Sequence, residues 1–312
     1  MMRRARAAIL RLISENETLL RAAVKAAAAL LLPALIARLL PVPEVLGSLP
    51  ALLCAALCGA VFPDFMLMIV CAVYAVAGLA MHSPAAGICG GVLIGLLLLI
   101  FLCFVPRRGL TAALFAVGMC LHFPYAVLAP AVLLGGGSAA AACLLTGAGW
   151  YGAAALMETE ASAGFSVEES LADVPETLVK LFTNRQILIG LIILLAAALV
   201  IWLISLLPAG NALFFAAVFG AVCYAALGIM ELQLKEQGTF AVLADTAAGL
   251  LTGLAAAWLT ARPDYKRAYT LRFEDDEYYY TVRAVPKIGE ASADRTASPM
   301  SGQGEDNEEA EE

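Results

Sequence analysis

Long apolar runs, rather than alternating hydrophobic and polar positions, dominate the 312-residue chain. Runs of about 20 residues with few charges are typical of transmembrane helices, because a helix of that length crosses the hydrocarbon core of a bilayer. The pattern predicts an all-α polytopic membrane bundle of about eight transmembrane helices, separated by short polar or proline-containing breaks. The expected spans are 26–40, 50–62, 65–81, 85–105, 138–157, 187–207, 211–230 and 240–260.

The segment 111–135 departs from this pattern. Its first apolar run is only 12 residues long, from Thr111 to His122, and the second is interrupted by Pro130. Pro124 and Pro130 lack an amide hydrogen, so each is expected to leave a carbonyl one turn earlier without its usual donor. Such backbone is tolerated at membrane depth only where it is buried in protein or lines a cavity. Two interpretations remain open: a re-entrant hairpin or Pro-broken segment, and an ordinary kinked span.

Composition and charge agree with a membrane bundle. Hydrophobic residues make up 62% of the chain and charged residues 14%, with a mean hydropathy of +0.86, which excludes an ordinary soluble domain. Basic residues flank the apolar region and follow the fourth predicted span, and the positive-inside rule places these points in the cytoplasm. They are Arg3, Arg4, Arg6, Arg107, Arg108, Arg262, Lys266 and Arg267. Both termini are therefore predicted to be cytoplasmic, which favours the re-entrant interpretation.

Polar segments divide the chain further. The expected parts are a basic cytoplasmic N-terminal segment (1–25), an N-terminal transmembrane bundle (26–157), an extramembrane loop with an amphipathic helix (158–186), a C-terminal three-helix transmembrane group (187–260), a cytoplasmic β-hairpin (261–288) and a disordered acidic tail (289–312). The hairpin is predicted by alternation from Tyr269 to Val285. Because an isolated hairpin is marginal in water, it is expected to dock on the bundle, a second copy or a protein partner.

Few residues in the predicted spans carry chemistry. Asp245 lies inside the last span, and a carboxylate in a membrane usually faces a partner or a water-filled path. The alternative is a hydrated carboxylate near the interface, bonded to a threonine or to backbone. We expect the stretch 122–137 to line a polar crevice that faces the late spans, with Asp245 as a partner. The candidates for a transport pathway are His122, Pro124, Tyr125, Pro130 and Asp245, whereas Asp64 is expected to be an ordinary turn residue.

Glycines spaced four residues apart form two small faces on the predicted spans. Gly87, Gly91 and Gly95 form one of them, and Gly249 and Gly253 form the other. Such faces let helix backbones approach closely. The close packing is expected inside the bundle, with dimerisation as the alternative.

Motifs for other functions are missing from the sequence. His82 and His122 belong to no paired-ligand pattern, no GxSxG sequence is present, and all eight cysteines fall in apolar segments, where they are expected to be buried. We therefore expect no metal site, no cofactor and no enzymatic activity. A basic patch with interleaved aromatic residues is also missing, so the expected partner is the lipid bilayer and not nucleic acid.

Two motifs resemble a known group of proteins. The sequence FEDDEYYYTVRAVPK at 273–287, after the last span, and the sequence His122-Phe-Pro-Tyr125 resemble poorly characterised bacterial multi-pass membrane proteins that are often labelled only "ABC-transporter permease". The resemblance implies a location in the bacterial cytoplasmic (inner) membrane and a role in transport. Because no lysine follows a glycine, the chain has no Walker A loop, and the resemblance implies a separate ATPase subunit as partner.

Two hypotheses for the function follow. The first is a transporter or permease-like subunit of unknown substrate, based on the bundle, the segment 111–135 and Asp245. The second is a membrane scaffold or assembly subunit that binds partners through the C-terminal hairpin.

Overall fold

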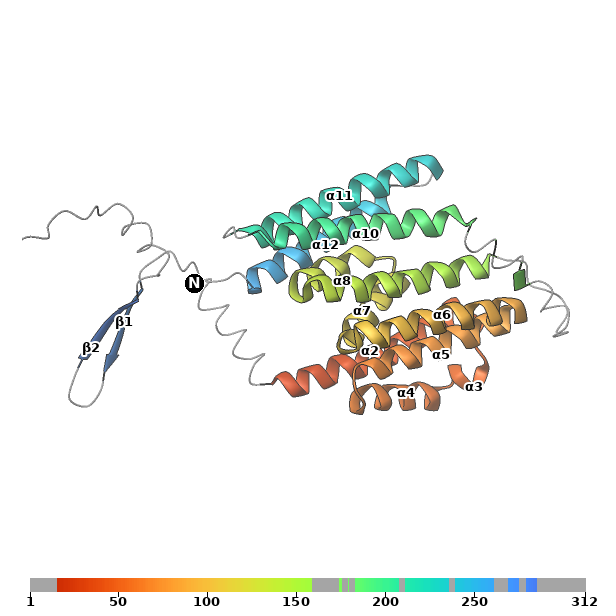
Figure 1. Cartoon of the computed structure of the whole chain (residues 1–312). Coiled ribbons are helices and arrows are strands. Elements are labelled where there is room, and N and C mark those ends of the chain that lie inside the picture. Colours follow the sequence, from red (N-terminus) through yellow and green to blue (C-terminus); the bar gives the residue numbers. More distant parts are fainter. Residues whose placement is uncertain are drawn as a thin grey trace, which may run out of the picture. The chain divides into compact units, whose positions relative to one another are not determined.

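The computed structural model describes residues 16–158, 174–175, 179, 183–207, 211–235, 239–260, 269–274 and 279–284. The chain divides into two compact units, Met1–Ala261 and Arg262–Glu312. Apolar helices build the first unit (Figure 1). They are α2 (Glu17–Leu39), α3 (Glu44–Gly47), α4 (Leu49–Val61), α5 (Phe65–His82), α6 (Pro84–Phe104), the short 3₁₀ helix η1 (Pro106–Arg108), α7 (Gly109–Cys120), α8 (Pro124–Met157), α10 (Arg185–Ser205), α11 (Ala212–Lys235) and α12 (Phe240–Thr260).

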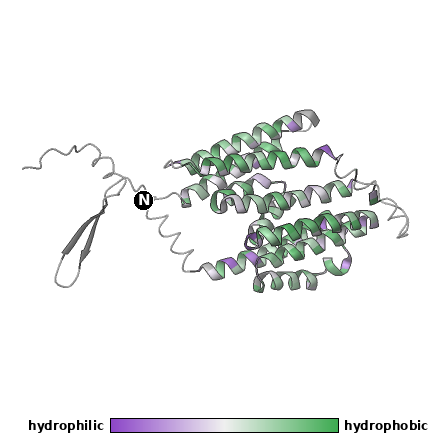
Figure 2. Ribbon diagram, viewed as in Figure 1, coloured by the Kyte–Doolittle hydropathy of each residue, from purple (hydrophilic) through white to green (hydrophobic). Residues whose placement is uncertain are grey.

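Within the described residues, seven helices are long and apolar enough to cross a membrane: α2, α5, α6, α8, α10, α11 and α12. Hydrophobic positions cover most of these helices, and hydrophilic positions gather toward their ends (Figure 2). The multi-pass membrane bundle is therefore confirmed, and seven of the eight expected spans correspond to helices long enough to cross; the eighth, 50–62, corresponds to a shorter apolar helix. This helix is α4, which has 13 residues and a length of about 20 Å, short of the hydrocarbon thickness of about 30 Å.

The helix α4 nevertheless brings the chain back toward the N-terminal end of α2. Lys25 Nζ donates a hydrogen bond to the carbonyl of Phe62, just beyond the end of α4, at 3.0 Å. At the opposite end of α4, the Tyr74 hydroxyl of α5 donates to the carbonyl of Leu46 at 3.0 Å. Since α2 begins at Glu17 and not near residue 26, Lys25 belongs to the helix itself.

The segment 111–135 is a helical hairpin made by α7 and the first part of α8. Gly136 interrupts α8 with φ 64° and ψ −152°, a backbone conformation that favours glycine. Arg108 holds both sides of this break, because its Nη2 donates to the carbonyl of Gly135 and its Nε donates to Ser138 Oγ, each at 3.1 Å. Both ends of the hairpin therefore lie at Arg108, as the re-entrant interpretation predicts.

Beyond Gly136 the second part of α8 turns back and runs alongside α7. Gly147 packs against Phe115, which lies midway along α7, and Cys143 shares a buried cluster with Phe115 and Met119. Residues 138–157 thus form a separate pass of 20 residues, while the hairpin enters the bundle and leaves it on one side. The α7 arm has 12 residues and reaches about 18 Å into the bundle.

The N-terminal end of α2 and the C-terminal end of α12 lie on the same side of the first unit (Figure 1). Gly253 of α12 packs against Ala129, and the following turn of α12 therefore approaches the Arg108 end of the hairpin. The next residue to Arg108, Gly109, packs against the backbone of Asp64, whose side chain binds Lys25 of α2. Contacts through α8, Arg108 and Asp64 thus link the second half of α12 to the first half of α2.

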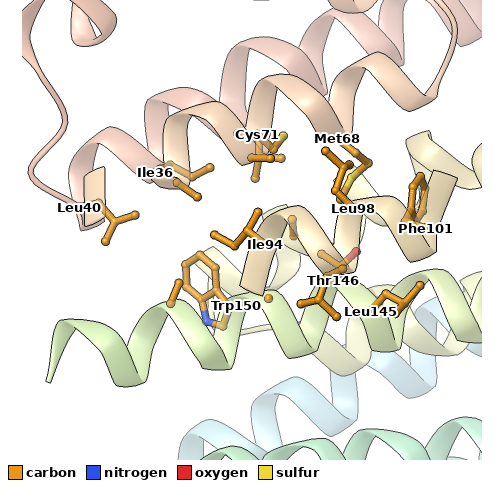
Figure 3. A pocket seen from close by; sticks show the side chains of 17 residues that line it. Ile36, Leu40, Met68, Cys71, Ile94, Leu98, Phe101, Leu145, Thr146 and Trp150 are labelled. Carbon is orange, nitrogen blue, oxygen red and sulfur yellow. The ribbon is translucent and has the colours of Figure 1, made fainter. Parts of the chain in front are cut away.

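An apolar cavity of about 110 Å³ lies between the early helices and α8 (Figure 3). Figure 3 shows Ile36 of α2 and Cys71 of α5 on one side of it and Thr146 and Trp150 of α8 on the other. Trp150 packs against the two largest buried clusters of the bundle.

The second unit contains the predicted β-hairpin. Its strands β1 (Tyr269–Glu274) and β2 (Tyr279–Ala284) pair antiparallel, with Leu271 opposite Val282 and Phe273 opposite Tyr280. The apolar positions that alternate in the sequence are therefore paired across the strands. The residues between the two strands, most of the predicted extramembrane loop 158–186 with its amphipathic helix, and the acidic tail lie outside the described residues.

Candidate functional site

The site is the tip of the hairpin, where α7 ends and α8 begins. His122 has a positive φ of 62°, the left-handed conformation that usually ends a helix at glycine. The amide of His122 donates to the carbonyl of Met119 at 3.2 Å, and the amide of Phe123 donates to that of Gly118 at 2.8 Å. These two bonds satisfy the last carbonyls of α7 in the Schellman arrangement. A tight turn inside the bundle is thus completed by its own backbone.

Asp245 of α12 caps the beginning of α8. Its Oδ2 accepts from the amide of Tyr125 and its Oδ1 accepts from the amide of Ala126, both at 3.1 Å. The first amides of a helix have no partner in the helix and carry its partial positive charge, so a carboxylate is stabilised there. No side chain on α8 itself provides this cap. A residue 120 positions away in sequence performs the role of the N-cap.

Two tyrosines enclose the carboxylate. The Tyr224 hydroxyl of α11 donates to Asp245 Oδ2 at 2.7 Å. Its ring stacks on that of Tyr125, with centroids 4.6 Å apart and planes at 17°. Asp245 is only 2% exposed and Tyr125 is fully buried. The buried carboxylate therefore has three donors, from two elements, and is excluded from solvent by the stacked rings.

Thr252, two turns further along α12, bonds to the same arm of the hairpin. Pro130 has no amide hydrogen to donate to the carbonyl of Ala126, four residues earlier. Thr252 Oγ1 donates to this carbonyl at 2.7 Å. In lipid this carbonyl must be satisfied by protein or water, and here its donor is a threonine hydroxyl.

Two glycines let α12 lie close to α8. A Cβ atom at Gly249 would meet the ring and the backbone of Tyr125, and one at Gly253 would lie 3.4 Å from the Cβ of Ala129. The predicted close packing at this pair of glycines is thus found inside the bundle. Asp245, Gly249 and Thr252 follow one another at the spacing of one helix face, which lies along α8.

Of the residues expected at a site, the structure brings Pro124, Tyr125, Pro130 and Asp245 together. Pro124 does not break a helix, because it occupies the first turn of α8, where a missing amide hydrogen costs nothing. His122 shapes the turn with its backbone, but its side chain is exposed. The interior of the hairpin packs tightly on the late helices, with Leu128 fully buried, so the described residues show dense packing where a polar crevice was expected.

Sequence reasoning missed Tyr224 and Thr252. Thr252 could have been found, because it lies seven residues after Asp245 on the face marked by Gly249 and Gly253. Tyr224 has no such signal in the sequence, since its role depends on how α11 packs beside α12.

A second buried carboxylate, Asp64, corrects the expectation of an ordinary turn residue. It is 8% exposed, and its two oxygens accept from Lys25 Nζ at 2.7 Å and from Arg21 Nη2 at 2.5 Å. Burial acts to raise the pKa of Asp64, but the hydrogen bonds and charges of Lys25 and Arg21 outweigh it and hold the pKa below 3.8. The turn between α4 and α5 is therefore held to α2 by an ion-pair cluster.

The described residues show neither a metal centre nor a disulfide. No group of three or more His, Cys, Asp or Glu side chains gathers in them. All eight cysteines are free; Cys54 and Cys103 are exposed on their helices, contrary to the expectation that all are buried. No known protein family matches the chain, and no curated protein or solved structure is found to be similar to it.

Proposed function

We propose that the chain is a transporter or permease-like membrane subunit and that the hairpin tip, closed by Asp245, is its gate. The observation that carries this proposal is the beginning of a helix inside the bundle, at Pro124, whose first amides bind a carboxylate from another helix. Helices that begin within a membrane recur in transporters, where their positive ends face anionic groups of the substrate.

The geometry favours a substrate with an anionic group. The donors at the tip are the amides of Tyr125 and Ala126 and the hydroxyl of Tyr224. All three donate hydrogen bonds to a carboxylate. A substrate carboxylate would compete with Asp245 for these three donors. When α12 moves away, the substrate takes its place, and when α12 returns, the tip closes again.

Accessibility measurements test whether Asp245 closes the tip. In a cysteine-free background, Phe123→Cys and Ala126→Cys are labelled with a small water-soluble thiol reagent, with Asp245 intact or replaced in Asp245→Asn. We expect labelling at residue 126 to rise several-fold in Asp245→Asn. Glu44→Gln, which removes an exposed carboxylate at α3, is the matched control and should leave labelling unchanged. Equal protection of residue 126 in all three backgrounds contradicts a gate at this position.

Transport itself is tested by electrophysiology on solid-supported membranes. Reconstituted wild type and Asp245→Asn are exposed to concentration jumps of small carboxylates and, for comparison, of amines and neutral solutes. We expect a charge movement with at least one carboxylate in wild type and in Glu44→Gln, and none in Asp245→Asn. Responses that are absent for every carboxylate, or identical in Asp245→Asn, contradict the proposal.

The C-terminal hairpin supports the second candidate, a scaffold or assembly subunit. Its two strands pair Leu271 with Val282 and Phe273 with Tyr280, and a two-stranded sheet of this size requires further packing for stability. We expect a protein partner, such as a separate ATPase subunit, to bind here. Deletion of 262–312 should abolish co-purification of that partner and leave the charge movement of the bundle intact if the two functions are separate.

A further inference from the structure

A cavity of about 670 Å³ with several charged lining residues opens at the end of the bundle where α2, α5 and η1 begin. Three of its lining residues are cationic and one is anionic. It is lined by Thr18, Arg21, Ala22, Lys25, Pro63, Asp64, Phe65, Pro106 and Arg107. This cavity lies apart from the hairpin tip and is independent of the proposed transport function.

Cationic side chains outnumber anionic ones among the described residues that line the cavity. Arg21, Lys25 and Arg107 carry three positive charges, and Asp64 carries one negative charge, so the lining has a net charge of +2. Both oxygens of Asp64 are bonded, one to Lys25 and one to Arg21, which fixes these two side chains in the cavity wall. The Arg21 side chain is still 55% exposed, and Arg107 is exposed as well. The cavity therefore presents guanidinium groups to a ligand.

The position of the cavity identifies the ligand chemistry. Its cations come from the first half of α2 and from η1, which follows the end of α6, and Pro63, Phe65 and Pro106 add apolar wall beside them. The positive end of α5 begins at Phe65 in the same wall. Guanidinium groups bind phosphate oxygens with two parallel hydrogen bonds, and basic pockets between membrane helices accept anionic lipid headgroups. We propose that this cavity binds the phosphate group of an anionic lipid headgroup.

A bound lipid would connect two parts of the bundle that are distant in sequence. Arg21 belongs to α2, and Arg107 belongs to η1 immediately before Arg108, which holds the base of the hairpin. A phosphate between Arg21 and Arg107 ties α2 to the hairpin's base. Anionic lipid should therefore stabilise the folded bundle.

Thermal stability in lipid nanodiscs tests the proposal. The full chain is placed in discs of phosphatidylcholine alone or with increasing phosphatidylglycerol, and the melting temperature is measured by intrinsic fluorescence. We expect a saturable rise in melting temperature with phosphatidylglycerol in wild type, reduced by at least half in Arg21→Gln and Arg107→Gln. Arg38→Gln is the matched control, because it removes an exposed arginine near the other end of α2, outside the cavity.

Further measurements distinguish a lipid phosphate from a soluble phosphate. Inorganic phosphate added to phosphatidylcholine discs should give no rise; a rise equal to that with phosphatidylglycerol would overturn the lipid assignment in favour of a soluble phosphate ligand. An equal loss of the lipid effect in Arg38→Gln, or no lipid effect in wild type, would overturn the site itself. If a cavity variant fails to fold, native mass spectrometry of wild type in mixed lipid decides: retained phosphatidylglycerol supports the site, and non-selective loss of both lipids rejects it.

Discussion

Pro130 and Thr252 form a complementary pair across two helices. The proline removes one amide hydrogen from α8, and the threonine hydroxyl supplies a replacement to the carbonyl of Ala126 at 2.7 Å. In water such a carbonyl would find a solvent donor, but in lipid it has none. The pair therefore illustrates how a single proline in a membrane hairpin determines the residue type needed on its neighbour.

We expect Thr252→Val to lower the free energy of unfolding by about 1 kcal/mol, because it leaves the Ala126 carbonyl without a donor. In a Pro130→Ala background the new amide can bond this carbonyl, so the same change should cost much less. A double-mutant cycle on melting curves measures the difference as a coupling energy. Thr246→Val is the control, since its hydroxyl bonds only its own helix at Val242. Equal losses from Thr252→Val in both backgrounds would show that the two residues are not coupled.

Asp64 should make stability depend on pH in a defined direction. Its pKa is held below 3.8 in the folded chain by Lys25 and Arg21, against the effect of burial. A carboxyl with a lowered pKa contributes its stability at pH values above 3.8 and loses it as the pH falls through the folded-state pKa. The difference in melting temperature between wild type and Asp64→Asn should thus be full at pH 7 and shrink below pH 3.8. A constant difference down to pH 3 would mean that the ion pair does not stabilise the fold.

At the scale of elements, the contact between α8 and α12 depends on the absence of one side chain. Gly249→Ala would place a methyl group 2.9 Å from the backbone of Tyr125. We expect it to lower the free energy of unfolding by about 1–3 kcal/mol, as overpacking does, and to loosen the cap at Asp245. Gly149→Ala is the matched substitution: its methyl group would lie 3.7 Å from Leu97, in the wall of the apolar cavity. It should raise stability by about 0.5–1 kcal/mol. Equal effects from the two substitutions would contradict this packing.

The sequence predicted these elements well where hydrophobicity alone determines them. The predicted span 240–260 coincides with α12, and the prolines and glycines of 111–135 indicated the hairpin. Pro124 was misjudged, because a proline that begins a helix and one that breaks a helix look alike until the previous helix is known to end at Cys120. Asp64 was also misjudged, because its partners Arg21 and Lys25 are about 40 residues away, and only the packing of α4 on α2 brings them together.

At the scale of the whole molecule, we expect the beginning of α2 and the end of α12 to lie on the same side of the membrane. Both the beginning of α2 and the end of α12 are linked to the Arg108 end of the hairpin. Reporter fusions after Ala5 and after Gly289 should therefore report the same side, and the positive-inside rule predicts the cytoplasm. Fusions after Pro208 and after Gln237, in the connections on either side of α11, should report opposite sides. Opposite orientations of the two terminal fusions would contradict the hairpin arrangement.

The cap on the hairpin tip also has a consequence for biosynthesis. The amides of Tyr125 and Ala126 are made 120 and 119 residues before the carboxylate that binds them. At roughly 5–20 residues per second, this interval lasts about 6–24 seconds. During that time the tip must remain beside the insertion machinery, a chaperone or water, because lipid offers its amides no acceptor. A ribosome that stalls before α12 leaves a chain with an uncapped helix end inside the membrane. Synthesis of the last helix therefore supplies the carboxylate that completes the hairpin tip.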